Sequence, residues 1–273
     1  MAEQQKEMSF LGHLEELRWH LVRSVAAIFI LAITFFVFAE DVYNHFLLAH
    51  IKPDFITYQL FCDFFNLIGM DSAFCDVNFS DKKLQSIKVT SQLMNSIWSS
   101  LILGLIIAFP YLLWEIWRFV SPGLTPHEIK KSRGFIFIAS FLFFIGVLFS
   151  FFVIAPISIH FLYNYQITDA IENSFTLESH IGLVTNMLLG VSILFELPVL
   201  IYFLTKIGLI TPEFLKRYRK HALVVVLILA AIITPPDVAS QVIVAIPILI
   251  LYEIGIKVSK RVIKNQEKNA NKS

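Results

Sequence analysis

Long apolar runs without charged residues dominate the sequence and predict helices that cross a membrane. Runs of this kind cover residues 24–39, 89–114, 134–168, 179–195 with a continuation at 197–205, 221–236 and 238–252. A helix needs about 20 residues to cross a bilayer core, and transmembrane strands alternate apolar with polar residues, which these runs do not. We therefore predict an all-α, polytopic membrane protein with six transmembrane helices, at approximately 21–39, 89–117, 134–160, 179–205, 220–236 and 238–256.

The last two helices and the two ends of this single membrane domain (1–273) have features of their own. Helices 5 and 6 are short, with 16 and 15 uncharged residues, so either flanking side chains reach the interface or the bilayer thins around them. Apolar residues also recur at helical spacing before the first helix, at Phe10, Leu14, Leu17 and Leu21. They predict a cytoplasmic amphipathic segment over 1–20, although an ordinary lead-in to the first helix fits equally well. Residues 257–273 are expected to form a tail.

Composition excludes several classes of protein. Hydrophobic residues make up 56% of the 273 residues, charged residues only 16%, and the mean hydropathy is +0.70. Soluble domains are roughly 25% charged, and a soluble chain of this size could not cover so much apolar surface. The net charge of +1 gives no overall field that would attract nucleic acid. An ordinary soluble enzyme, a disordered chain and a nucleic-acid binder are therefore excluded.

The basic residues predict the orientation in the membrane. Of the 22 Lys and Arg residues, 18 lie in the N-terminal segment, in the loops after the second and fourth helices, and in the tail. The other four lie in the long loop 41–88, between the first two helices. Since Lys and Arg near short loops stay in the cytoplasm, we predict that both termini are cytoplasmic.

Cys62 and Cys75, the only cysteines, both fall in the long loop on the far side of the membrane. If that side is a periplasm, disulfides persist there, and we predict a Cys62–Cys75 disulfide. Two buried free thiols are the alternative reading.

Catalytic motifs are missing. The sequence has no G-x-x-x-x-G-K-[ST] phosphate loop, no zinc protease motif and no G-x-S-x-G elbow, and its histidines and cysteines lack a metal-ligand spacing. We expect no enzyme, no cofactor and no metal, which leaves transport, channel or receptor functions.

Polar residues in and beside the helices are the candidate functional groups. Glu196 interrupts the fourth helix in FELPVL, where Pro198 predicts a kink, and it is either functional or a buried link between helices. The turn between helices 5 and 6 gathers Thr234, Pro235, Pro236, Asp237 and Gln241; Asp237 could simply cap helix 6.

A third group lies on the cytoplasmic side. Glu16 and Arg18 precede the first helix, and Glu128 lies in the first cytoplasmic loop. Carboxylates pair well with guanidinium groups, so these acids would suit a basic ligand, although most surface acids are only solvated.

Four sequence runs, in order, carry a family resemblance. They are HLEELR from His13, FVSPGLTPHE from Phe119, FELPV from Phe195 and TPPDVASQ from Thr234. Together with the six-helix topology, they resemble the TatC family, the multi-span receptor subunit of the twin-arginine protein translocase. The likeness covers roughly residues 10–261, and His20 stands where the family is often basic.

The resemblance implies a function and site residues. A subunit of this kind recognises the paired arginines of signal peptides on folded cargo at the cytoplasmic (inner) membrane. It also recruits single-span TatA/TatB-type subunits, and the protonmotive force drives export. By position, Glu16 and Glu128 would contact the arginines, and Arg18 and Phe119 would shape that surface.

The resemblance also assigns the intramembrane residues. Glu196 would be the intramembrane polar residue, and Thr234 with Gln241 would contact a partner helix. Self-association and contacts with membrane lipids are further expectations. The competing hypotheses are a secondary transporter for a small solute and a membrane scaffold without cargo recognition.

Overall fold

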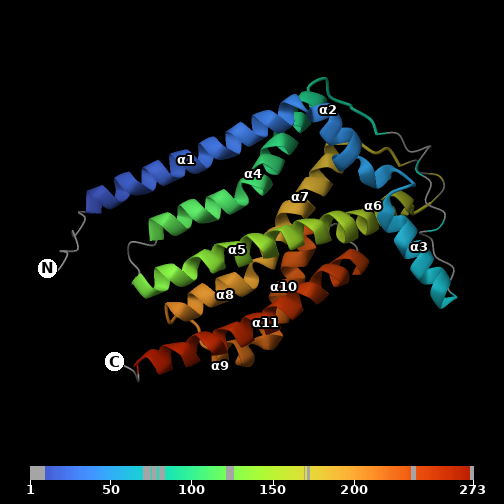
Figure 1. The fold of residues 1–273 in the computed structure, drawn as a ribbon. Helices are drawn as coiled ribbons and strands as arrows, with labels where there is room; N and C mark the ends of the chain where they lie inside the picture. Colours follow the sequence, from blue (N-terminus) through green and yellow to red (C-terminus); the bar gives the residue numbers. More distant parts are fainter. Residues whose placement is uncertain are drawn as a thin grey trace. The chain divides into compact units, whose positions relative to one another are not determined.

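The computed structural model describes residues 10–69, 75, 79, 84–120, 126–168, 170, 173–234 and 238–270 (Figure 1). Its helices are α1 (Phe10–Val37), α2 (Ala39–Val42), the π-helix η1 (Tyr43–Leu47), the 3₁₀-helix η2 (Ala49–Ile51), α3 (Ile56–Ile68), α4 (Ser91–Val120), α5 (Pro126–Phe149), the π-helix η4 (Ser150–Ile154), α6 (Ala155–Asn164), α7 (Leu177–Phe195), α8 (Leu197–Lys206), α9 (Pro212–Arg217), α10 (Arg219–Ile233) and α11 (Val238–Ala270). These residues contain no strand, only an isolated bridge between Gln85 and Thr176. The all-α prediction is confirmed.

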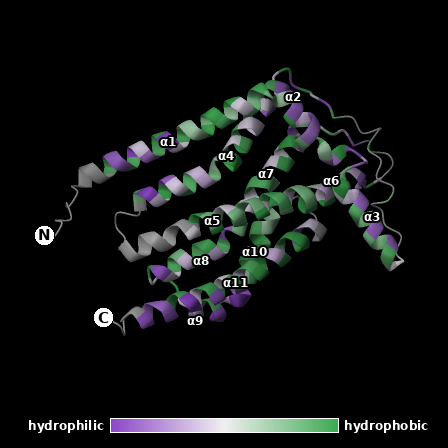
Figure 2. Ribbon diagram, viewed as in Figure 1, coloured by the Kyte–Doolittle hydropathy of each residue, from purple (hydrophilic) through white to green (hydrophobic). Residues whose placement is uncertain are grey.

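Five segments of the described chain are long and apolar enough to cross a membrane. They are Leu14–Val37, Ser91–Phe119, Ile136–Asn164, Leu177–Lys206 and Ser240–Lys268, and Figure 2 shows apolar residues along much of their length. The predicted fifth transmembrane helix corresponds to α10, which has 15 residues. At about 1.5 Å per residue it spans only about 22 Å, so it is short in the way its sequence predicts.

Two helices continue beyond the apolar runs that predict them. In its described part, α1 is one helix from Phe10 to Val37, so the amphipathic segment and the first transmembrane helix are continuous. The sixth helix, α11, has 33 residues and extends well past its short uncharged run. Lys, Glu and Arg are good helix formers. The extension is also held by two hydrogen bonds: the Thr205 hydroxyl donates to the Ser259 hydroxyl, and Gln266 Nε2 donates to the Lys206 carbonyl.

Two breaks in the helices lie beside prolines, although Pro110 and Pro247 lie inside the continuous helices α4 and α11. Glu196 lies between α7 and α8, and Pro198 occupies the first turn of α8. In the third transmembrane segment, the π-helix Ser150–Ile154 precedes Pro156, and α6 then continues to Asn164. Proline has no backbone N–H to donate, so it favours a break at both of these sites.

The chain forms two compact units, residues 1–39 with 96–141, and residues 40–95 with 142–273. In the first unit, α1 packs against α4 at Gly104. A Cβ atom at this position would stand 2.9 Å from the Ile28 carbonyl oxygen. The second unit has the larger buried core, with fully buried apolar side chains at Ile154, Ile159, Ile181, Met187, Leu188 and Ile248.

The long segment between the first two transmembrane helices is attached to the π-helix of the same unit. His50 Nε2 donates to the Phe151 carbonyl (2.9 Å), and the Thr57 hydroxyl donates to the Phe152 carbonyl (2.7 Å). A π-turn leaves carbonyls outside the regular helical pattern, and here buried side chains satisfy them. In the same segment, Cys62 and Cys75 are joined by a disulfide, with Cα atoms 4.8 Å apart.

Candidate functional site

Glu16 and Arg18, predicted to face a signal peptide, lie on α1 with exposed side chains. Glu16, His20 and Arg23 are spaced by four and three residues, so they share one face of the helix. The Phe119 ring of α4 lies 6.1 Å from the His20 ring, measured between centroids. Phe119 therefore lies beside the face of α1 that carries Glu16 one turn away.

Below this surface, Glu115 of α4 forms a buried cluster with His20 and Arg23 of α1. The Glu115 side chain is 1% exposed, and its Oε2 contacts His20 Nδ1. Its Oε1 lies 3.2 Å from Arg23 Nε and accepts a hydrogen bond from the Tyr111 hydroxyl (2.8 Å). Arg23 Nη2 also lies 3.0 Å from His20 Nδ1. A buried carboxylate is therefore balanced by a guanidinium and further hydrogen-bonding groups.

The sequence pattern alone does not single out Glu115. It closes an apolar run near the C-terminal end of α4, where polar residues are ordinary. The usable signal is weak: Tyr111 and Glu115 share a face of α4, while His20 and Arg23 share a face of α1. Only the packing of α1 against α4 joins these two pairs.

The second acid predicted for this surface is Glu128. Glu128 lies in the first turn of α5, and its side chain lies outside the described residues, as does the connection 121–125. Pro235, Pro236 and Asp237, the predicted turn between helices 5 and 6, also lie outside the described residues.

Glu196 lies at the break between α7 and α8, half-buried. Both of its carboxylate oxygens are buried without a hydrogen-bond partner among the described residues; the backbone of Phe143 on α5 faces them. One turn before Glu196, α5 and α7 pack closely, because a Cβ atom on Gly146 would stand 2.7 Å from the Ser192 Cα. The carboxyl thus has unused hydrogen-bonding capacity within an apolar surrounding.

Thr234 and Gln241 bond within their own chain. The Thr234 hydroxyl donates to the Ala230 carbonyl (2.9 Å), and Gln241 Nε2 donates to the Leu227 carbonyl (3.0 Å). Next to Gln241, the hydroxyls of Ser240 and Ser158 are 2.6 Å apart. Gln241 therefore links α11 to α10 and is half-buried.

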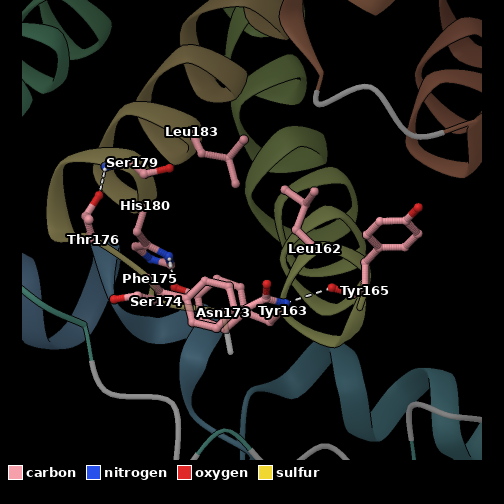
Figure 3. Close-up of a pocket in the computed structure, with 10 residues that line it drawn as sticks. All are labelled: Leu162, Tyr163, Tyr165, Asn173, Ser174, Phe175, Thr176, Ser179, His180 and Leu183. Atoms are coloured by element: carbon pink, nitrogen blue, oxygen red, sulfur yellow. Dashed lines mark hydrogen bonds between the residues drawn. The ribbon is translucent and has the colours of Figure 1, made fainter. Parts of the chain in front are cut away.

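A cavity of about 400 Å³ lies in the second unit, between the end of α6 and the start of α7 (Figure 3). Buried Tyr163 and His180 line it, with the Tyr163 hydroxyl 3.0 Å from His180 Nδ1. His180 Nε2 donates to the Leu47 carbonyl (3.2 Å). Both ring nitrogens are occupied, so His180 joins three segments rather than offering a free catalytic group.

Comparisons with known proteins decide the family. A sequence model of the family described as Sec-independent protein translocase protein (TatC) matches residues 12–247. The chain belongs to the TatC family. It is therefore related to protein translocase subunits and is a multi-pass membrane protein.

Individual TatC proteins match over nearly the whole chain. The Sec-independent protein translocase protein TatC of Blattabacterium sp. subsp. Periplaneta americana is 39% identical, covering 97% of this chain and 100% of the relative. The TatC of Carboxydothermus hydrogenoformans is 37% identical, covering 93% and 94%. The crystal structure of a twin-arginine translocase receptor, TatC, has a TM-score of 0.69 and 32% identity, covering 92% of this chain and 99% of that one.

Proposed function

We propose that this TatC chain is the receptor subunit that binds the paired arginines of signal peptides on folded cargo proteins. The subunit works in the cytoplasmic (inner) membrane with both termini in the cytoplasm, and acts by binding rather than by catalysis. The exposed carboxylate of Glu16 carries the proposal, because it lies on the face of α1 that meets Phe119. A carboxylate can accept two parallel hydrogen bonds from a guanidinium group, which an ammonium group cannot supply in that geometry.

Peptide titration tests this proposal. A fluorescent peptide with paired arginines, and a twin with paired lysines, are titrated into the purified chain in lipid nanodiscs. We expect the arginine peptide to bind more tightly, and Glu16→Gln and Glu128→Gln each to lower its affinity about tenfold, the scale of one lost charge-assisted hydrogen bond. Glu15→Gln is the matched control, since Glu15 is equally exposed but lies on another face of α1.

The orientation is tested separately by proteolysis. Protease added to the outside of spheroplasts should leave an N-terminal tag intact, and protease added to inverted vesicles should remove it.

Salt tests the binding site itself. An affinity for the arginine peptide that does not fall with added salt would contradict an exposed ion-pair site.

A second surface is proposed for partner subunits. Glu196, Thr234 and Gln241, with the turn of Pro235, Pro236 and Asp237, would contact the helices of single-span TatA/TatB-type subunits. The unused hydrogen-bonding capacity of Glu196 supports this assignment. Photo-crosslinking from Gln241 should capture a small membrane subunit, whereas crosslinking from Glu128 should capture the signal peptide.

The driving force and the alternative function have their own tests. An uncoupler that collapses the protonmotive force should stop export of a folded reporter without weakening peptide binding. A small-solute secondary transporter is the competing function, and it would bind the arginine and lysine peptides equally. Copies of the chain and membrane lipids are further expected partners.

A further inference from the structure

Helix α1 buries few of its residues inside the described chain. Only 6% of the residues in the apolar window of this helix are buried, the smallest share among the five membrane-crossing segments of the described chain. Among the described residues, two sets of contacts with α4 lie at different levels of the helix. Ile28 and Ala32 meet Gly104, and His20 and Arg23 meet Glu115. Glu16 lies beyond both levels, toward the start of the helix.

Of these two sets of contacts, the one between Glu115 and the pair His20 and Arg23 can control the position of Glu16. From Ile28 to Glu16 the helix is about 18 Å long, so a tilt of about 10° at the Gly104 contact would move Glu16 by about 3 Å. That displacement is as large as the donor–acceptor distance of a charge-assisted hydrogen bond, about 2.8 Å. It would therefore break two parallel hydrogen bonds to one guanidinium group. The Glu115 cluster fixes α1 only one turn from Glu16 and prevents this tilt.

The chemistry of the cluster suits a fixed anchor. Glu115 uses Oε2 toward His20 and Oε1 toward Arg23 and Tyr111, from two helices and with a nearly fully buried side chain. Removing one member of such a set leaves a buried charge or polar group without its partner, so the arrangement favours one relative placement of the helices. The same cluster holds Phe119, whose ring lies against His20.

We infer that Glu115 is a positioning residue for arginine recognition, acting through His20 and Arg23 to hold Glu16 and Phe119 in binding geometry. This inference rests on the proposed function of Glu16 as the contact for a signal-peptide guanidinium. Glu115 itself is too deeply buried to touch the peptide.

The test compares two peptides in single and double variants of the full-length chain. Glu115→Gln retains the shape and most hydrogen bonds of the side chain but removes its charge. We expect it to lower the affinity for the arginine peptide about tenfold and to lower the affinity for the lysine peptide less. A merely structural loss would weaken both peptides by the same factor. In a Glu16→Gln background, Glu115→Gln should have a smaller effect on the affinity for the arginine peptide, because one of the two residues that it positions is already changed.

Position is measured directly with spin labels at Trp19→Cys and Ile116→Cys, two exposed sites on α1 and α4. Glu115→Gln should broaden the distribution of distances between the labels. Glu178→Gln, an exposed acid paired with Lys88, should leave both the distances and the affinities unchanged. If Glu115→Gln does not fold, His20→Gln provides the same test, because it leaves the Glu115–Arg23 pair in place.

Arg23→Gln separates the inference from its closest rival. It should lower the affinity, as Glu115→Gln does; a higher affinity would mean that Arg23 competes with the peptide for Glu115 and would overturn the positioning role. If Glu115→Gln leaves the arginine-to-lysine ratio at its wild-type value, the inference fails while the proposed function stands. If the wild-type chain itself does not discriminate between the peptides, the proposed function fails.

Discussion

Gly104 on α4 lies so close to Ala32 on α1 that a Cβ atom added to the glycine would stand 2.8 Å from the Ala32 nitrogen. The neighbouring atoms are backbone, which cannot move aside as a flexible side chain would. We expect Gly104→Ala to destabilise the chain by about 1–3 kcal/mol, as overpacked cores do. Thermal unfolding in detergent measures this effect.

Gly182 on α7 is the matched control for that substitution. A Cβ atom at Gly182 would have no neighbour within 4 Å. Alanine favours a helix over glycine by about 1 kcal/mol, so Gly182→Ala should stabilise the chain. Equal effects of the two substitutions would contradict the close approach of α1 and α4.

A second prediction concerns acid pH. Burial lowers the pKa of His50 to about 4, from an ordinary value of 6.5. The unfolded chain therefore takes up the proton more readily, so stability is complete above pH 6.5 and is lost as pH falls from 6.5 toward 4. The loss is at most about 3 kcal/mol for a shift of this size.

Hydrogen exchange of the 43–68 segment at pH 7 and pH 4.5 measures this loss. His50→Gln, which can still donate to the Phe151 carbonyl but does not titrate near these values, should reduce the pH dependence. His45→Gln, at an exposed position, should leave it unchanged. A wild-type segment equally protected at both pH values would contradict the prediction.

The disulfide between Cys62 and Cys75 gives a third prediction. The two residues are 13 positions apart, and closing a loop of that size stabilises a chain by about 3 kcal/mol in the loop-entropy model. Cys62→Ser with Cys75→Ser should therefore lower the unfolding temperature. Alkylation without a reductant should modify neither thiol of the wild-type chain; labelling of both would show that the bridge is absent.

The sequence predicts the apolar helices and their breaks because these depend on local composition. Apolar runs indicate the membrane-crossing segments, and Pro198 indicates the break beside Glu196. The length of α11 is not predicted, because a change from apolar to charged residues looks like the end of a membrane helix. The helix in fact continues, since residues such as Lys260 are good helix formers.

The candidate site is predictable only in part, for a similar reason. Glu16 and Phe119 are found through motifs that occur as contiguous runs. Glu115 has no such run, since its partners His20 and Arg23 are more than 90 positions away and meet it only through helix packing. The anchoring of His50 on the Phe151 carbonyl escapes prediction too, because Pro156 indicates a break but not which distant side chain bonds to the carbonyl beside it.

The last prediction concerns Glu196, where stability and function should change in opposite directions. Among the described residues, the buried carboxylate oxygens of Glu196 have no hydrogen-bond partner, which lowers stability, and a neutral or apolar group of similar shape relieves that penalty. We expect Glu196→Gln to leave the unfolding temperature unchanged or higher, and Glu196→Leu to raise it by the equivalent of about 1–2 kcal/mol.

Export should respond in the reverse order if Glu196 contacts a partner helix. Glu196→Gln keeps a hydrogen-bonding group and should retain part of the export of a folded reporter, whereas Glu196→Leu should abolish it. Peptide affinity should not change in either variant, because Glu196 is assigned to the partner surface and not to the contacts with the signal peptide. A residue needed only for folding would show falling stability together with falling export, and that pattern would contradict a partner-binding role for Glu196.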